Sequence, residues 1–469
     1  MTAPLAELHL HLYGCLSSDR VLDMLVRAPR PAWHVYEPTF QRVYGRASPA
    51  RALVERHRQG DPAAAREFRE LFVFGDEDSG SFGRFQAKFD LIAAASVVGL
   101  AVQEEEFRPA AIAEIRGTAR AVLEDQARQG IGYAEQRFFF GARTPVELVE
   151  EGLTALLEEY RGWERPIARL AASLPRSNPW AHWDVVQRLA LSDLGSHLTA
   201  VDFCFIEEGH PPKEQRAMFD AVHDHNARNP ERALAILYHV GESFDDKSLE
   251  SAVRWVHEAA EMGCHRLGHA IALGVDPEAY ASAGVQVARR HFLPPSRSGS
   301  GPVVHTRRES AAERRDQVLY DLRHAYALER LGVRIDRPAL ARELDTLSRR
   351  PPIDELTVEY DATRLHEVRA RQRHAMAAVR SHGAVIEVCP TSNLRIGGLR
   401  DPAHHPVQRF WDEGVPVVVA SDDPGIFGTT LRDELAWVGK HLALDAEQLE
   451  VLASQAWHSR SERLSGRER

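Results

Sequence analysis

The stretch Leu5-Ala6-Glu7-Leu8-His9-Leu10-His11-Leu12 is the first of eight short apolar segments that recur along the 469-residue chain. The other seven are residues 132–139, 167–173, 198–203, 234–239, 265–269, 385–389 and 415–420. Apolar residues at helical spacing fill most of the intervals, for example residues 147–163, 213–228 and 249–262. This alternation predicts parallel strands joined by crossover helices. Eight such units fit an α/β fold of the closed (β/α)8 TIM-barrel type better than an open sheet.

Two intervals are too long to be ordinary loops. Residues 14–128 contain helical patterns and are predicted to form a helical elaboration after the first strand. Residues 288–382, between the sixth and seventh strands, contain 19 arginines and 13 acidic residues in a chain whose net charge is −10. We expect an Arg-rich inserted helical subdomain there, whose arginines form either a solvated surface or an interface for a homo-oligomer. Otherwise residues 1–469 are predicted to be one barrel domain, with a flexible polar tail at 457–469.

The composition argues against several classes of protein. The acidic net charge does not provide the cationic field that binding of bulk nucleic acid needs. No apolar window approaches the length of a membrane span and the first residues do not resemble a leader, so we expect a cytoplasmic protein with no membrane partner. The four cysteines are scattered and never at CxxC spacing, which disfavours a disulfide framework or a thiolate zinc site.

Histidines and aspartates at strand ends suggest a metal site. His9 and His11 flank Leu10 in the first strand, so both imidazoles point to one face of the sheet. His239 ends the fifth strand and Asp422 follows the eighth, at the carboxyl edge where barrel enzymes assemble their sites. Three imidazole nitrogens and a carboxylate are a plausible zinc set that leaves room for water. Taken singly, each of these residues could instead be an ordinary polar residue of the core.

Three further residues are candidates for proton transfer. Glu242 begins the loop after the fifth strand, three residues beyond His239, and His269 closes the sixth strand. Asp423 is adjacent to Asp422, so the two side chains must diverge, and one of them is then aimed toward the space that a substrate would occupy. The structural alternative for the aspartates is an ordinary turn.

The order of these motifs resembles the adenosine/AMP deaminase family. Six segments carry the resemblance, in order along the chain: ELHLHL at 7–12, YAEQR at 133–137, HVGE at 239–242, RLGH at 266–269, EVCPTSN at 387–393 and SDDP at 421–424. The resemblance covers nearly the whole chain except the insertion between the sixth and seventh strands. It implies a TIM-barrel, metal-dependent deaminase with one zinc ion per chain, held by His9, His11, His239 and Asp422. Zinc lowers the pKa of bound water toward about 7, which makes hydroxide available at neutral pH.

The resemblance also implies roles for the remaining candidates. Glu242 would protonate N1 of a purine, which makes C6 electrophilic enough for attack by water. His269 would orient and deprotonate the water, and Asp423 would accept a hydrogen bond from the water or the ring. Gly241 would let the ring approach the backbone closely.

Two departures from the family pattern concern the substrate. Tyr13 stands where the family commonly has an aspartate that receives a sugar hydroxyl, and Phe205 stands where a glycine commonly contacts the base. Together with the Arg-rich insertion, these changes favour a 5'-nucleotide, whose phosphate needs cationic partners.

The sequence therefore predicts zinc-dependent hydrolytic deamination, in purine metabolism, of a small-molecule purine nucleoside or nucleotide. The candidate substrates are adenosine, deoxyadenosine, AMP and dAMP, and the products are the inosine counterpart and ammonia. Two alternatives remain open at this point. One is an amidohydrolase that acts on another base or on an amide, and the other is a non-enzymatic assembly protein built on a retained barrel.

Overall fold

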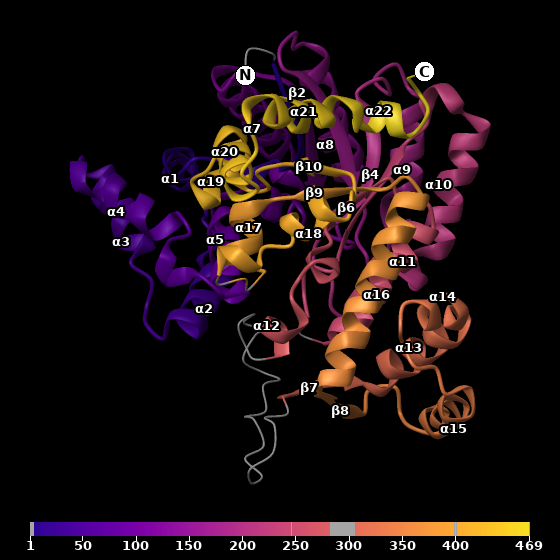
Figure 1. Cartoon of the computed structure of the whole chain (residues 1–469). Coiled ribbons are helices and arrows are strands. Elements are labelled where there is room, and N and C mark those ends of the chain that lie inside the picture. The colour runs from indigo at the N-terminus through magenta and orange to yellow at the C-terminus, as the bar shows by residue number, and fades with distance from the viewer. Residues whose placement is uncertain (1–3, 245, 282–304, 398, 400, 469) are drawn as a thin grey trace.

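The centre of the molecule is a sheet of eight parallel strands in the order β1-β2-β3-β4-β5-β6-β9-β10 (Figure 1). The computed structural model describes residues 4–244, 246–281, 305–397, 399 and 401–468. The segment after β10 returns to β1 through a bridge between Leu10 and Asp422. There the amide of His11 donates to the Asp422 carbonyl at 3.2 Å, and the Asp422 amide donates to the His9 carbonyl at 3.0 Å. The predicted TIM barrel is therefore confirmed.

The eight barrel strands coincide with the eight apolar segments of the sequence to within two residues at each end. They are β1 (Leu5–His11), β2 (Ile131–Phe139), β3 (Ile167–Ser173), β4 (Leu198–Phe203), β5 (Ala235–Val240), β6 (Arg266–His269), β9 (Val385–Val388) and β10 (Val417–Val419). Nearly every residue of these strands is buried. Strands of a parallel sheet are covered on both faces, which explains why they appear in the sequence as almost continuous apolar runs.

Helices follow the strands and cover the outside of the barrel (Figure 1). The longer ones are α7 (Arg108–Arg128), α8 (Val146–Arg161), α9 (Trp180–Leu191), α10 (Arg216–Arg228), α11 (Leu249–Glu261), α16 (Ala362–Ser381), α20 (Leu431–His441) and α21 (Ala446–His458). Shorter ones are α17 (Pro390–Arg395), α18 (Val407–Asp412) and α19 (Pro424–Phe427). In α11, residues 249–260 are all buried, although they include Arg254, His257 and Glu258. Other helices must therefore cover the outer face of α11 as well. In the described part of the chain, no helix has both the length and the apolar character that crossing a membrane requires.

The interval between β1 and β2 is helical, as the sequence predicts. Its helices before α7 are α1 (Ser18–Arg27), α2 (Trp33–Tyr44), α3 (Ala50–Arg58), α4 (Pro62–Phe72), α5 (Phe82–Ala95) and α6 (Val98–Ala101). In Figure 1 they form the indigo group at one side of the barrel. Side chains of α5 reach the cavity described below.

Between β6 and β9 the chain leaves the barrel and returns. The elements there are α12 (Pro277–Ala281), β7 (His305–Ser310), α13 (Ala311–Arg323), α14 (Ala325–Arg330), α15 (Arg337–Ser348) and β8 (Glu355–Tyr360), with β7 and β8 paired antiparallel. Residues 288–304 of the predicted subdomain 288–382 lie outside the described residues. At its other end, α16 packs against α11 and leads directly into β9, as a crossover helix of the barrel does.

The prediction of a flexible tail at 457–469 is wrong for the described residues of that segment. Helix α21 continues to His458, and α22 (Ser461–Leu464) packs against the barrel. Ser461 and Glu462 are buried; the Ser461 hydroxyl donates to Glu135 at 2.6 Å, and Glu462 pairs with Arg169. The polar composition that suggested disorder instead satisfies charged groups of β2 and β3, and composition alone does not reveal such partners.

Candidate active site

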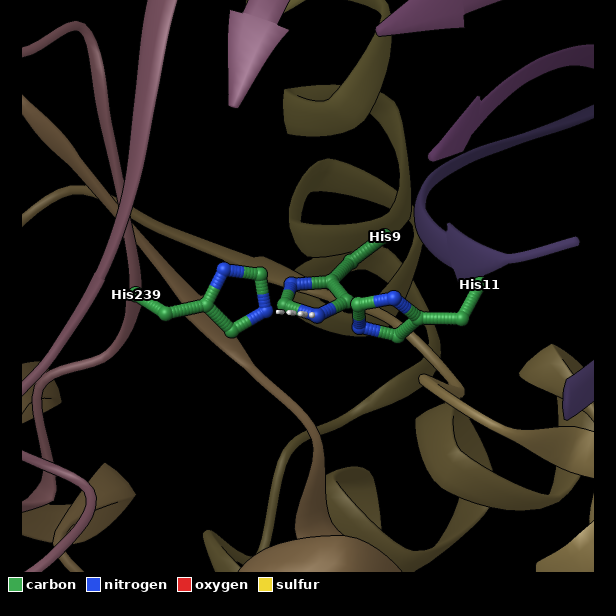
Figure 2. Close-up of side chains that lie close together, drawn as sticks. All are labelled: His9, His11 and His239. Carbon is green, nitrogen blue, oxygen red and sulfur yellow. Dashed lines mark hydrogen bonds between the residues drawn. The ribbon is translucent and has the colours of Figure 1, made fainter. Parts of the chain in front are cut away.

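The predicted metal ligands converge at the carboxyl ends of the strands (Figure 2). His9 and His11 lie two residues apart in β1, and their ring centroids are 5.4 Å apart. The ring of His239, from β5, lies 4.8 Å from His9 and 5.3 Å from His11. Asp422 Oδ1 lies 3.4 Å from His9 Nε2 and 3.3 Å from His11 Nε2. Residues distant in sequence thus form one compact set of three nitrogens and a carboxylate.

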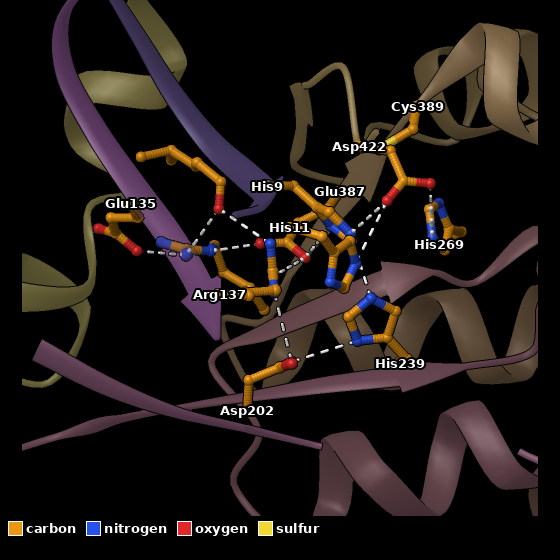
Figure 3. Close-up of polar contacts among 12 residues, drawn as sticks. His9, His11, Glu135, Arg137, Asp202, His239, His269, Glu387, Cys389 and Asp422 are labelled. Carbon is orange, nitrogen blue, oxygen red and sulfur yellow. Dashed lines mark hydrogen bonds and ion pairs between the residues drawn. The ribbon is translucent and has the colours of Figure 1, made fainter. Parts of the chain in front are cut away.

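Buried carboxylates orient two of these imidazoles (Figure 3). His9 Nδ1 lies 2.8 Å from Glu387 Oε2, and His239 Nδ1 lies 3.2 Å from Asp202 Oδ1. Donation of each Nδ1–H to its carboxylate leaves both Nε2 lone pairs facing the centre, where the two Nε2 atoms are 3.1 Å apart. Burial lowers the pKa of His239 to about 4, so this imidazole is neutral. Metal-ligating histidines are typically held in this way by an outer acceptor.

A buried ionic network lies beneath the ligands. Arg137 Nη2 donates to Glu387 Oε2 at 2.6 Å, and its Nε lies 3.4 Å from Asp202 Oδ1. Arg266 donates to Glu387 Oε1 at 2.7 Å and also pairs with Glu135. All five side chains are almost fully buried. Burial acts to raise the pKa of Glu387, but Arg137, His9 and Arg266 hold it well below its usual range. The acceptor for His9 is therefore an anion.

None of these five residues is among the functional residues predicted from the sequence. Asp202, Arg137, Arg266 and Glu387 all stand within apolar strands, and a charged residue in such a strand is the one signal that could have revealed a network. Their partners, however, depend on how β2, β4, β6 and β9 meet across the barrel.

Asp422 and Asp423 diverge as expected, and the backbone explains how. Asp422 has a φ of +61°, in the left-handed region that non-glycine residues rarely adopt. Its carboxylate turns to the imidazoles, while Asp423 is buried with Oδ1 lacking a hydrogen-bond partner among the described residues. Burial, and then the charge of Asp422, raises the pKa of Asp423 well above its usual range. Gly14 makes room for this carboxyl group, because a Cβ at Gly14 would lie 1.6 Å from Asp423 Oδ1.

Glu242 and His269 lie beside the same centre. Glu242 Oε1 is 3.4 Å from His269 Nε2, and Asp422 Oδ2 is 3.8 Å from that nitrogen. Burial, and then the charge of Asp422, raises the pKa of Glu242 well above its usual range, which favours the protonated acid. The side-chain amide of Asn393 donates to His269 Nδ1 at 3.1 Å, which places the imidazole proton on Nε2. Both predicted proton-transfer groups therefore face the predicted ligands.

The loop that carries Glu242 is held by a residue that the sequence analysis missed. The carboxylate of Glu207 accepts hydrogen bonds from the amides of Gly241, Glu242 and Ser243 at 3.0–3.1 Å. Gly241 has a φ of +68°, and a Cβ there would lie 2.6 Å from a methyl group of Val256. Chain geometry thus accounts for this glycine, and its contact with a substrate stays a prediction.

A cavity of about 390 Å³ adjoins these residues. Its lining includes His11, His239, Glu242, His269 and both aspartates. The remaining walls are strongly aromatic: Tyr13, Phe82, Phe85, Phe89, Phe138, Phe139 and Phe205. Phe139 and Phe205 stack with centroids 5.1 Å apart, and the side chain of Phe205 is 60% exposed. The cavity therefore offers an apolar, aromatic environment next to a polar centre.

Two expectations about the sugar and phosphate can be compared with this cavity. Tyr13 does line it, but the Tyr13 hydroxyl donates to Glu114 Oε1 at 2.9 Å. No cavity residue comes from the described part of the insertion, 305–361, where arginines pair with acidic residues, as Arg314 does with Glu343 at 2.6 Å. Within the described residues, the insertion therefore supplies no arginine for a phosphate at this cavity.

Comparisons with known proteins agree with this architecture. Residues 350–462 match the family model for adenosine deaminase. The aminodeoxyfutalosine deaminase of Acidothermus cellulolyticus is 49% identical over 59 residues, which are 13% of this chain and 17% of that protein. The chain matches only 17–24% of the length of the first curated relatives.

Two solved structures resemble the whole chain in fold. The N6-mAMP deaminase of Arabidopsis has a TM-score of 0.53 at 15% identity, covering 98% of this chain and 93% of its own. A cog1816 amidohydrolase from Burkhoderia ambifaria, solved with bound Zn, has a TM-score of 0.51 at 14% identity, covering 97% of this chain and 85% of its own. The matched segment contains the EVCPTSN and SDDP motifs, and the fold of the remainder agrees with it. Residues 350–462 are thus similar to adenosine deaminases in sequence, and the whole chain is similar to these two proteins in fold.

Proposed function

We propose that the chain is a zinc-dependent hydrolase that removes the amino group from an adenine-type base of a small molecule. One observation supports the proposal most strongly. Glu242, His269 and Asp423 all lie beside the predicted metal ligands and line the same aromatic cavity. This arrangement disfavours the alternative of an assembly protein that retains only the barrel, because every predicted acid or base is present and aimed at the same space.

The residues present fit a divalent metal. His9, His11 and His239 offer nitrogens, Asp422 offers an oxygen, and the lone pairs of His9 and His239 face each other at 3.1 Å. Nitrogen and carboxylate ligands suit zinc, and a fold relative was solved with bound Zn. We propose one zinc ion at this site in each chain. Such an ion, when bound, supplies the Lewis acidity that makes water nucleophilic near neutral pH.

The side chains of the site divide the proton transfers between them. Protonated Glu242 is placed to donate to a ring nitrogen of the base, which would increase the electrophilic character of the carbon that carries the amino group. His269, with its proton on Nε2, donates toward the region between Glu242 and Asp422. Asp423 Oδ1, which has no hydrogen-bond partner among the described residues, is available for a hydrogen bond with water.

The aromatic walls bear on the choice of substrate. A base stacks favourably between aromatic rings, whereas a phosphate would need cationic partners that the described insertion does not bring to the cavity. We therefore propose an unphosphorylated nucleoside, with adenosine, deoxyadenosine or a nucleoside that has an apolar 5'-substituent preferred over AMP and dAMP. The aminodeoxyfutalosine deaminase among the relatives makes aminodeoxyfutalosine a further candidate.

An ammonia-release assay tests both the reaction and the substrate. Zinc-loaded protein is given adenine, adenosine, deoxyadenosine, AMP, dAMP, aminodeoxyfutalosine and a cyclic ureide in parallel, and conversion is followed by the loss of adenine absorbance. We expect ammonia from at least one unphosphorylated adenine nucleoside and a slower reaction of its 5'-phosphate. Turnover of the ureide alone would refute deamination, and preference for AMP or dAMP would refute the substrate assignment.

A further inference from the structure

A second group of three imidazoles lies on the flank of the barrel, outside the active site. His257 comes from α11, His374 from α16, and His324 from the junction of α13 and α14. Their ring centroids are 4.8, 4.9 and 5.0 Å apart. This spacing is as close as the 4.8–5.4 Å found among His9, His11 and His239. We call His257, His324 and His374 the flank triad.

The flank triad is largely removed from water. His257 is 2% exposed, and the side chain of His324 is 13% exposed. His324 Nε2 is buried and has no hydrogen-bond partner among the described residues. An unsatisfied buried nitrogen is costly, and a bound ion is one way to satisfy it. Burial, and then the proximity of His257, lowers the pKa of both His324 and His374 to about 4, so both rings are neutral and can offer lone pairs.

The hydrogen bonding of His257 suggests which nitrogen would bind an ion. His257 Nδ1 lies 2.6 Å from the Tyr320 hydroxyl. When Nδ1–H donates to this oxygen, the lone pair of Nε2 faces Glu261 Oε1 at 3.4 Å. Two electron-rich atoms at this distance are stabilised by a cation between them. An outer oxygen that fixes the second ring nitrogen is also a usual feature of metal-ligating histidines.

Glu261 supplies a fourth ligand from one helical turn beyond His257. Its Oε1 lies 3.8 Å from His324 Nε2, and His324 Nδ1 lies 3.2 Å from His374 Nε2. Ligands of a tetrahedral zinc ion, bonded at about 2.0–2.1 Å, lie roughly 3.3 Å from one another. Glu261 Oε1 lies 3.4 Å from His257 Nε2 and 3.8 Å from His324 Nε2, and one nitrogen of each of the three rings lies within 4.8 Å of the other two. His324 faces His374 through Nδ1 and Glu261 through Nε2, so its ring must reorient for a single nitrogen to bind the ion together with both neighbours.

We propose that the flank triad and Glu261 form a second zinc site, with a structural role. Four protein ligands leave no open position for water, which is the property of structural rather than catalytic zinc. The ion would connect α13 and α14 of the insertion to α11 and α16 of the barrel. This inference does not depend on the deaminase assignment, since it concerns other residues and a different property.

Metal stoichiometry tests the proposal directly. The whole protein is stripped with a chelator, reloaded with Zn²⁺, desalted and analysed for metal. We expect two zinc ions per chain in the wild type, one in His374→Gln and one in His9→Ala/His11→Ala. His366→Gln is the matched control, because His366 is an exposed histidine of the same helix as His374, and this variant should keep two. One zinc ion in the wild type, or two in His374→Gln, would overturn the second site.

A spectroscopic measurement keeps the test decisive if His374→Gln does not fold. Co²⁺ is added to stripped His9→Ala/His11→Ala protein, in which the flank triad is intact, and to stripped wild type. The visible absorption bands of tetrahedral Co²⁺ should saturate at one equivalent of Co²⁺ per chain in the variant and at two equivalents in the wild type. Saturation of the wild type at one equivalent would exclude the flank site. Because these readouts do not involve turnover, an inactive but doubly loaded protein would contradict the proposed function and leave the second site standing.

Discussion

The molecule contains two triads of histidine with nearly the same ring spacing and different surroundings. His9, His11 and His239 lie at strand ends, next to a cavity of about 390 Å³ and to Asp423, whose Oδ1 has no hydrogen-bond partner in the described part of the chain. The flank triad lies between helices, with Glu261 and Tyr320 as its nearest polar neighbours. Closely spaced imidazole rings indicate a metal site in both places. The cavity beside the first triad and the acids that line it indicate that this site is catalytic.

The largest expected effect concerns turnover. Glu242→Gln keeps the shape of the side chain but removes the proton that the base requires, so kcat should fall by about 10² to 10⁴. The metal content should stay unchanged, because Glu242 is not one of the predicted ligands. His374→Gln is the matched substitution in the flank triad and should leave kcat within about twofold. If kcat fell by comparable factors in the two variants, the two triads would not differ as a catalytic and a structural site.

The second prediction concerns the ionic network beneath the active-site triad. Glu387→Gln removes the charge that Arg137 and Arg266 share while nearly preserving volume. Loss of one partner from a buried ion pair typically costs about 3–5 kcal/mol in the free energy of unfolding. Glu343→Gln makes the same change in a partly exposed pair with Arg314 of the insertion, where the cost should be below about 1 kcal/mol. Guanidinium denaturation measures both, and equal costs would mean that the network adds no special stability.

The third prediction concerns the residues that orient each triad. Asp202→Asn should weaken zinc at the active site by about 10- to 100-fold, since His239 loses its anionic acceptor. Tyr320→Phe removes the oxygen near His257 and should weaken zinc at the flank triad, with an effect of at most similar size. Competition with a chelator measures the two affinities. Each variant should change only its own site, and a cross-effect would show that the two sites are not independent.

The active-site triad could be predicted from the sequence and the flank triad could not. Each active-site ligand stands near or just after the end of an apolar strand, and parallel barrel strands bring such ends together whatever their separation along the chain. His257 lies on α11, His374 on α16 and His324 just after α13, and these residues meet only through the packing of α13 and α16 on α11. No periodicity in the sequence fixes that packing.

The same reasoning explains the other differences between expectation and structure. The eight strands were predictable because each is a continuous apolar run. The pairing of Arg266 with Glu387 depends on β6 and β9 being neighbours, although an insertion of more than a hundred residues separates them. The burial of Ser461 depends likewise on a carboxylate of β2, which the polar composition of the C-terminal segment does not reveal.

The smallest expected effect is a pH dependence of stability that originates at the flank triad. The pKa of His324 and of His374 is lowered to about 4 in the folded protein, whereas an unfolded histidine has a pKa near 6.5. Between these values the unfolded chain binds more protons, so the free energy of unfolding should decrease as the pH falls from about 6.5 toward 4. Urea denaturation of metal-stripped protein across this range measures the slope. His324→Gln/His374→Gln should flatten the slope relative to the wild type, and His366→Gln should not.

Zinc should steepen this dependence of stability on pH, since protons then compete with the metal for the same nitrogens and acid releases the ion. If the free energy of unfolding changed with pH equally with and without zinc, these histidines would bind no metal. The flank triad would then be a purely hydrogen-bonded cluster.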